Sequence, residues 1–327
     1  MNPTAFGASP VAFVFPGQGS QHVGMGKALS EVSEVAREVF RRADETLGFP
    51  LSRLCFEGPE PELNDTINAQ PAILTVSIAC LNSLRERWHS MGEVISPRVV
   101  AGHSLGEITA LVAADVLDFE PALRLVRERG RLMKENGLSH PGGMMAVLGL
   151  DRPIVDELVR DASSAGVITV ANANSPGQLV LSGEPVALER AAELARARGA
   201  ARVIRLPISI ASHSPLMARA AAQFGELVAH LPLRQPRMPV VGNITGQLLT
   251  TADDIRRELG EHIIGPVQWT TSVLEMVARG SASFLEIGPG QVLSGLIRRI
   301  TQEVQVITLN DGEIARSLKR PTEPRLP

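Results

Sequence analysis

The chain of 327 residues contains no tyrosine, and aromatic residues make up only 3% of it. This scarcity disfavours a protein that stacks nucleic-acid bases on aromatic side chains, and it removes tyrosine as a catalytic acid. Cys55 and Cys80 are the only cysteines, too few for a disulfide framework or a cysteine-based zinc site. The sequence therefore predicts no metal centre and no disulfide-stabilised fold.

Positive charge is not in excess either. The formal net charge is −3, whereas a nucleic-acid-binding protein shows a basic balance. The chain does not open with the basic start and long apolar run of a signal peptide, and no apolar run looks long enough to cross a membrane. We therefore expect a cytoplasmic protein with neither a nucleic-acid nor a membrane partner.

What the chain does contain is an alternation of short β-branched runs and helical patterns, which is typical of an α/β fold. Residues 11–15 (VAFVF) and 97–104 (PRVVAGHS) predict strands that lead through sharp turns into helices. Further strand-like runs are PVVGNITG, SFLEIG and VQVITLN. We predict an α/β-hydrolase-like body with a parallel sheet.

The middle of the chain follows a different pattern. Between residues 138 and 207 the expected order is β-α-β-β-α-β, which is typical of a ferredoxin-like unit. We predict that this subdomain is inserted into a body formed by residues 11–137 and 208–310, which leaves a cleft between the two parts. Residues 311–327 are charged and rich in proline, so we expect a flexible tail.

Arg129 raises a question of charge. It belongs to a helix predicted from Asp118 as N-cap to a stop at Gly137, and helical spacing places it beside Leu125 and Val126 on the apolar side. A guanidinium there keeps its proton and needs an anion. The anion is either a buried structural carboxylate or a group brought by a substrate.

The segment GHSLG, residues 102–106, has the G-x-S-x-G form between a predicted strand and a predicted helix. In this context it predicts a nucleophile elbow that lifts the Ser104 hydroxyl above the strand ends. The following helix start offers free N–H groups to a developing oxyanion. The alternative is an ordinary tight turn with an inert serine.

A nucleophilic serine needs a base, and seven histidines are available. His213 follows a predicted strand, at the end where α/β sites form, and is the favoured candidate. His262 is the second choice, and the side chain of His103 should point away from the site. No carboxylate is clearly placed as a third member, so we expect the backbone to orient the base.

The loop PGQGSQ, residues 16–21, ends the first predicted strand. Gln18 can supply an oxyanion N–H opposite the amide of Leu105. The loop matches neither the dinucleotide fingerprint nor the P-loop. An ordinary strand-to-helix turn is the alternative interpretation.

These segments occur in a specific order: FPGQGSQ, INAQPAILTVS, GHSLGE, an arginine 25 residues past the serine, NANSPGQLVLSG, SHSPLM, GPVQW and EIGPGQVLSGL. This order resembles the malonyl-CoA:acyl carrier protein transacylases, a family that includes the acyltransferases of polyketide synthases. The resemblance covers about residues 11–310.

The resemblance implies roles for residues at matching positions. Ser104 would carry the acyl ester, His213 would act as base and then acid, and Arg129 would bind the free carboxylate of a malonyl-type group. Leu105 and Gln18 would supply the oxyanion N–H groups. The resemblance further implies that Gln70 lines the pocket, and that a backbone carbonyl at the position of His262 holds the base.

The implied reaction is ping-pong transfer from a CoA thioester to the phosphopantetheine thiol of an acyl carrier protein, without metal or cofactor, by a chain that we expect to be a monomer. Fatty-acid synthesis and a polyketide pathway served in trans both stay open.

Substrate choice is also left open. The run Ile210-Ala211-Ser212-His213 resembles methylmalonyl enzymes, because Ser212 makes room beside the acyl α-carbon, whereas Leu105 resembles malonyl enzymes. We favour malonyl and keep a methylmalonyl or ethylmalonyl loader as an alternative. Two further alternatives are a hydrolase of acyl carrier protein thioesters and an inactive module that binds a carrier protein.

Overall fold

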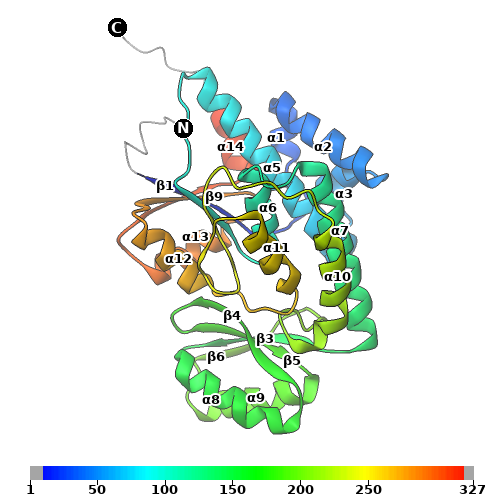
Figure 1. The fold of residues 1–327 in the computed structure, drawn as a ribbon, viewed down its shortest axis with the longest axis vertical. Coiled ribbons are helices and arrows are strands. Elements are labelled where there is room, and N and C mark those ends of the chain that lie inside the picture. Colours follow the sequence, from blue (N-terminus) through cyan, green and yellow to red (C-terminus); the bar gives the residue numbers. More distant parts are fainter. Residues whose placement is uncertain (1–9, 320–327) are drawn as a thin grey trace.

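A six-stranded sheet forms the centre of the larger part of the molecule (Figure 1). The computed structural model describes residues 10–319. The strand order is β10-β9-β1-β2-β7-β8, and every pair is parallel except β7 with β8. The strands are β1 (Val11–Phe15), β2 (Val99–Gly102), β7 (Val240–Val241), β8 (Leu248–Leu249), β9 (Ser283–Ile287) and β10 (Gln305–Leu309).

Helices cover both faces of this sheet, which explains why strand β1 is buried along its whole length. Phe13 and Phe15 point into one core, whereas Ala12 and Val14 point into the other. The helices of this larger part are α1 (Lys27–Val32), α2 (Glu34–Leu47), α3 (Leu51–Glu57), α4 (Glu60–Asn64), α5 (Thr66–Ser90), α6 (Leu105–Ala113), α7 (Phe119–Ser139), α10 (Ala218–Ala229), α11 (Ala252–Glu261), α12 (Trp269–Ala278), α13 (Val292–Ile300) and α14 (Asp311–Lys319).

Helix α5 corrects the expectation that no run could cross a membrane. Its 25 residues are long and apolar enough to do so by length and composition. However, 83% of its most apolar window is buried inside the protein, where it packs against α2, α6 and α7. Its apolar character therefore reflects a central place in the core.

The second sheet has the strand order β4-β5-β3-β6 and is antiparallel throughout. Its helices cover one face (Figure 1), which is the ferredoxin-like arrangement that the sequence predicts. Its elements are β3 (Gly143–Leu148), α8 (Arg152–Ala162), the 3₁₀ turn Ser163–Ala165, β4 (Ile168–Ser175), β5 (Gln178–Gly183), α9 (Pro185–Ala197) and β6 (Arg202–Arg205). The body resumes with the 3₁₀ turn Pro215–Met217.

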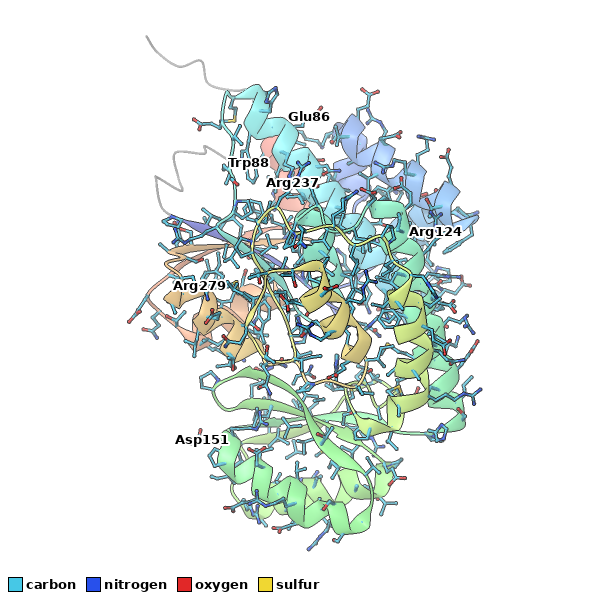
Figure 2. All side chains as sticks on the ribbon, in the orientation of Figure 1. Glu86, Trp88, Arg124, Asp151, Arg237 and Arg279 are labelled. Carbon is cyan, nitrogen blue, oxygen red and sulfur yellow. The ribbon has the colours of Figure 1, made fainter. Side chains whose placement is uncertain are left out.

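The subdomain sheet is joined to the body through the edge of β4. The Ala173 amide donates to the Val267 carbonyl over 2.9 Å, and the Val267 amide donates to Ala171 over 2.8 Å. Side chains fill the space between the elements of both parts (Figure 2), where Asp151 marks the start of α8 on the subdomain. These backbone bonds hold the subdomain against the body and so fix one wall of the cleft.

Two predictions need correction, one about the end of the chain and one about the start of helix α7. Residues 311–319 form helix α14 rather than a flexible tail, because Ile314 and Ala315 are buried in the main core; residues 320–327 lie outside the described part. Helix α7 begins after Asp118, as predicted, but the Asp118 side chain does not cap it. That carboxylate instead accepts two hydrogen bonds from Arg234.

Candidate active site

The predicted nucleophile elbow is present at the junction of β2 and α6. Ser104 has φ 49° and ψ −116°, a strained conformation for a residue with a side chain. Neighbouring glycines make the turn possible: a Cβ on Gly102 would lie 1.9 Å from the Gly106 backbone, and one on Gly106 would lie 2.1 Å from the Phe15 carbonyl oxygen. The elbow leaves the Ser104 hydroxyl facing the cleft.

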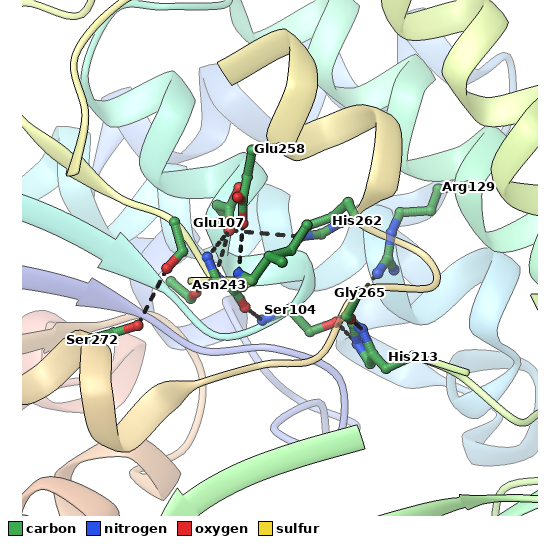
Figure 3. Close-up of polar contacts among 12 residues, drawn as sticks. Ser104, Glu107, Arg129, His213, Asn243, Glu258, His262, Gly265 and Ser272 are labelled. Atoms are coloured by element: carbon green, nitrogen blue, oxygen red, sulfur yellow. Dashed lines mark hydrogen bonds and ion pairs between the residues drawn. The ribbon is translucent and has the colours of Figure 1, made fainter. Parts of the chain in front are cut away.

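His213 is the histidine that meets the serine. Its Nε2 lies 2.8 Å from the Ser104 Oγ, and its Nδ1 lies 2.7 Å from the Gly265 carbonyl oxygen (Figure 3). A carbonyl only accepts, so Nδ1 carries the proton and Nε2 presents its lone pair to the hydroxyl. The backbone therefore orients the base, as expected in the absence of a third carboxylate.

The residue that supplies this carbonyl differs from the prediction. It is Gly265, three residues beyond His262. The His262 side chain is 1% exposed, its ring centroid lies 6.3 Å from that of His213, and its nitrogens have no hydrogen-bond partner among the described residues. Helix α11 ends just before His262 and the chain turns inward there, which buries the imidazole behind the site.

The surroundings of His213 keep its imidazole uncharged in the free site. Burial lowers the pKa of His213 to about 3, and the positive charge of Arg129 acts in the same direction. The hydrogen bond to Gly265 opposes this shift only in part. The imidazole is therefore neutral near pH 7 and free to accept a proton.

Arg129 points from α7 into the same place. It is 1% exposed, and it donates from Nη1 to the Gln70 Oε1 over 2.9 Å and from Nη2 to the Ser104 Oγ over 3.2 Å. Within residues 10–319 no carboxylate lies at ion-pair distance from it. Burial lowers its pKa to about 10, with the carboxyl of Glu107 opposing the shift. The structural ion pair considered from the sequence is thus not formed.

Gln70 supports Arg129 from behind rather than lining the pocket as predicted. It is fully buried and does not reach the cleft surface. Its Nε2 donates to the Thr66 Oγ1 over 3.0 Å, and that hydroxyl donates to the Gln18 Oε1 over 2.9 Å. This series of hydrogen bonds orients the Arg129 guanidinium and also holds Gln18 in the loop after β1.

The cleft beside Ser104 has a volume of about 200 Å³. The body supplies its polar wall, which includes Gln18, Arg129 and Ser212. Met144 and Val180 of the subdomain sheet form an apolar wall together with Leu206 and Ile208, which follow β6 in the chain.

The two residues that flank Ser104 in the chain differ in whether their side chains reach the cleft. His103 was expected to point away, but it lines the cleft and its Nε2 lies 2.8 Å from the Asn174 Oδ1, because the subdomain packs over it. Leu105 starts α6 with its side chain buried, so only its backbone is available to a ligand.

Sequence reasoning missed a polar group on the far side of the elbow. The Asn243 Oδ1 accepts from the Ser104 amide over 2.6 Å, and Glu107 lies directly behind Asn243 (Figure 3). Both side chains are buried. A signal was present in the sequence, since polar residues directly after an apolar strand, as in PVVGNIT, often lie at an α/β site.

The sequence also matches a known protein family. The family model named acyl transferase domain matches residues 12–322. The chain belongs to the acyl transferase family. In the part of this family member that the structure describes, no group of three or more His, Cys, Asp or Glu side chains could hold a metal ion.

Named relatives of this acyl transferase are similar over nearly their whole length. It is 42% identical to the malonyl CoA-acyl carrier protein transacylase of Bacillus subtilis, over 93% of this chain and 95% of that protein. It is also 42% identical to the transacylase of the same name from Escherichia coli strain K12, over 92% and 96%.

Solved structures share the fold of this acyl transferase. An acyl carrier protein S-malonyltransferase from Vibrio cholerae superposes with a TM-score of 0.89 at 39% identity, over 95% of this chain and 100% of that one. A malonyl-transacylase in complex with a type II PKS acyl-carrier protein gives a TM-score of 0.89 at 38% identity, over 95% and 99%.

Proposed function

We propose that this acyl transferase moves a malonyl group from CoA to the phosphopantetheine thiol of an acyl carrier protein. The observation that carries the proposal is the convergence on one cleft of Ser104, His213 and Arg129, which has no carboxylate partner within residues 10–319. The names of the similar proteins support the same substrate and partner.

In the first half-reaction the Ser104 Oγ attacks the thioester carbonyl carbon of malonyl-CoA while His213 Nε2 takes the hydroxyl proton. The new C–O bond forms, and the negative charge on the carbonyl oxygen is held by N–H groups of Leu105 and Gln18. The C–S bond then breaks, and His213 returns the proton to the departing CoA sulfur.

The second half-reaction repeats these steps in reverse. His213 accepts the proton of the phosphopantetheine thiol, whose sulfur attacks the acyl-serine carbonyl. The C–O bond to Ser104 breaks, and the proton returns to the Ser104 oxygen. Serine and histidine alone close this proton cycle, so the proposed reaction uses neither a metal nor a bound cofactor.

In this scheme the malonyl carboxylate is the anion that the buried Arg129 requires. A guanidinium fork binds a carboxylate through two parallel hydrogen bonds, so a malonyl group satisfies the buried charge whereas an acetyl group does not. We further propose that the enzyme is a monomer and that it is cytoplasmic. The buried, free thiols of Cys55 and Cys80 accord with a reducing compartment.

A branched extender unit is the second candidate. Ser212 lines the cleft, and a small side chain there leaves room beside the acyl α-carbon. An enzyme that loads methylmalonyl or ethylmalonyl would serve a polyketide pathway, whereas a malonyl enzyme would serve fatty-acid or polyketide synthesis.

The test is intact-protein mass spectrometry after brief mixing with equal amounts of malonyl-, methylmalonyl-, ethylmalonyl- and acetyl-CoA, with Ser104→Ala as control. A malonyl adduct that is absent from the control supports the proposal, and a branched adduct supports the second candidate. CoA release that continues without carrier protein would identify a hydrolase. Failure to form any adduct would leave an inactive module that binds a carrier protein.

A further inference from the structure

Asn243 makes a hydrogen bond to the backbone of the nucleophile. It follows strand β7 and is 2% exposed. Its Oδ1 accepts from the Ser104 amide over 2.6 Å, and its Nδ2 donates to the Gly102 carbonyl over 2.7 Å. A single side-chain amide thus bonds the elbow at both ends of its turn.

The orientation of this amide is fixed by its partners. The Ser104 N–H only donates and the Gly102 carbonyl only accepts, so Oδ1 must face the first and Nδ2 the second. Glu107 reinforces the arrangement, because its Oε2 accepts from the Asn243 Nδ2 over 2.5 Å and from the Asn243 backbone amide over 2.8 Å. A rotated side chain would place its NH₂ group against the Ser104 N–H and lose the three side-chain bonds, to Ser104, Gly102 and Glu107.

This matters because the Ser104 backbone lies outside the usual allowed regions, at φ 49°. Such a conformation persists only when the surrounding structure holds it. The direction of the Oγ toward His213 depends directly on that backbone. The bond from Asn243 therefore acts on the same torsions that aim the nucleophile.

We propose that Asn243 is a positioning residue that holds the Ser104 backbone in its attacking conformation, and that Glu107 keeps the Asn243 amide in the correct orientation. The inference rests on the proposed role of Ser104 as nucleophile. It assigns Asn243 no contact with the substrate.

Glu107 accepts both of its hydrogen bonds from Asn243, and three other titratable or charged groups lie around it. Glu258 accepts from the Ile244 amide over 2.8 Å, His262 Nε2 lies 3.9 Å from the Glu107 Oε2, and the charge of Arg129 acts from α7. Burial raises the pKa of Glu107, and the neighbouring Glu258 carboxyl raises it further. Asn243 requires only an oxygen acceptor, which a protonated carboxyl or a glutamine also offers.

The experiment measures the rate of acyl-enzyme formation from malonyl-CoA by quenched-flow mass spectrometry, without carrier protein. Asn243→Ala should slow acylation by about 10–100-fold, because small misplacements of a reacting group have effects of this size. The malonyl-CoA concentration at half-maximal rate should change by less than about threefold, since the residue does not touch the substrate.

Ser272→Ala is the matched control. Its hydroxyl donates to the Gly242 carbonyl over 3.3 Å, next to Asn243 but leading away from Ser104 (Figure 3). Acylation by this variant should stay close to the wild-type rate. An equal loss in Ser272→Ala would indicate general disturbance of the loop and overturn the inference.

Two further variants keep the inference testable if Asn243→Ala does not fold. Glu107→Ala should slow acylation, and Glu107→Gln should recover most of the loss by restoring the acceptor. Asn243→Asp keeps the acceptor for Ser104 but cannot donate to Gly102 until it is protonated, so its acylation should rise as the pH falls from 8 to 6. The wild-type rate should not rise over that range.

The outcomes separate the two proposals. If Asn243→Ala forms the adduct as fast as the wild type, the role of Asn243 is overturned. If Glu107→Gln is acylated as slowly as Glu107→Ala, the role of Glu107 is overturned. Either result leaves the proposed function intact. A wild-type enzyme that forms no adduct overturns the proposed function and this inference with it.

Discussion

The Nη2 of Arg129 lies 3.2 Å from the Oγ of Ser104. One buried cation therefore lies beside the atom that is proposed to carry the acyl group, and it has no carboxylate partner within residues 10–319. The short distance limits the acyl chain between ester and charge to a few atoms. Malonyl has this length, with a single carbon between its two carbonyl groups.

The first prediction concerns acyl selectivity. Arg129→Ala should lower the rate of malonyl loading at low substrate by roughly 100-fold, because about 3 kcal/mol of charged hydrogen bonding to the carboxylate is lost. Acetyl loading should change far less, so the preference between the two donors should collapse. Competition between malonyl- and acetyl-CoA, read as adduct mass, measures it.

Arg129→Lys is the control for this prediction, because it keeps a charge but loses the planar fork. It should recover part of the malonyl loading lost in the alanine variant. An alanine variant that still loads malonyl in strong preference to acetyl would contradict the role of Arg129.

The second prediction uses the support behind Arg129. Gln70→Glu places a carboxylate where Oε1 now accepts from Arg129 over 2.9 Å. This internal anion should compete with the malonyl carboxylate and raise the KM for malonyl-CoA by about tenfold or more. Steady-state kinetics measure the effect, and thermal unfolding checks that the new buried pair has not destabilised the fold.

Gln70→Met is the matched variant, with similar volume and no charge. It should loosen Arg129 and raise the KM less than the glutamate does. Equal KM values in the two variants would show that charge competition is not the cause.

The third prediction concerns pH. With its pKa lowered to about 3, His213 stays unprotonated from pH 8 down to pH 5, so acylation should not fall over that range through loss of the base. A histidine with the usual pKa would lose roughly thirtyfold of its neutral form between those limits. A rate that declines around pH 6.5 would contradict the lowered pKa.

Stability must be followed in the same experiment. The unfolded chain binds a proton at this histidine below about pH 6.5, whereas the folded chain does not, so the free energy of unfolding falls as the pH drops from 6.5 toward 3. Thermal unfolding at each pH separates this loss from any change in the chemical step.

The fourth prediction concerns the extender unit. Ser212→Phe should fill the space beside the acyl α-carbon, since Ser212 lines the cleft. Loading of methylmalonyl and ethylmalonyl, to whatever extent the wild type shows it, should fall by about tenfold or more through steric exclusion, while malonyl loading is retained. A Ser212→Ala control keeps the space and should preserve the wild-type ratio.

The elements that the sequence predicts best are those with strong local signals. The elbow around Ser104 and the strand Val11–Phe15 follow from glycine spacing and from β-branched runs. The βαββαβ order also follows from local patterns, and its sheet has the ferredoxin-like strand order. Ser104 and His213 pair across 109 residues. This pairing was predicted from a strand expected directly before His213, but that strand, β6, lies in the subdomain sheet and ends at Arg205.

The errors share a different cause. Neither the Gly265 carbonyl nor the Asn243 amide has a pattern that reveals which distant atom it bonds. Gln70 was placed on the cleft surface, but long-range packing sets it behind Arg129. A charged, proline-rich composition hid the apolar side of residues 311–319. Each of these outcomes depends on tertiary contacts, which local periodicity does not encode.

The last prediction tests helix α14, where composition misled. Ile314 is 1% exposed and belongs to the main core, and α14 packs against α1 and α5. Its Asp311 also accepts from the Gly26 amide over 2.8 Å. Ile314→Ala should reduce the free energy of unfolding by about 2–5 kcal/mol through lost burial and a residual cavity, measured by urea denaturation. Arg316→Ala, on the exposed side of the same helix, should change it by less than about 0.5 kcal/mol. Equal, small effects of the two substitutions would mean that α14 does not dock on the core and that the chain frays from Asp311 onward.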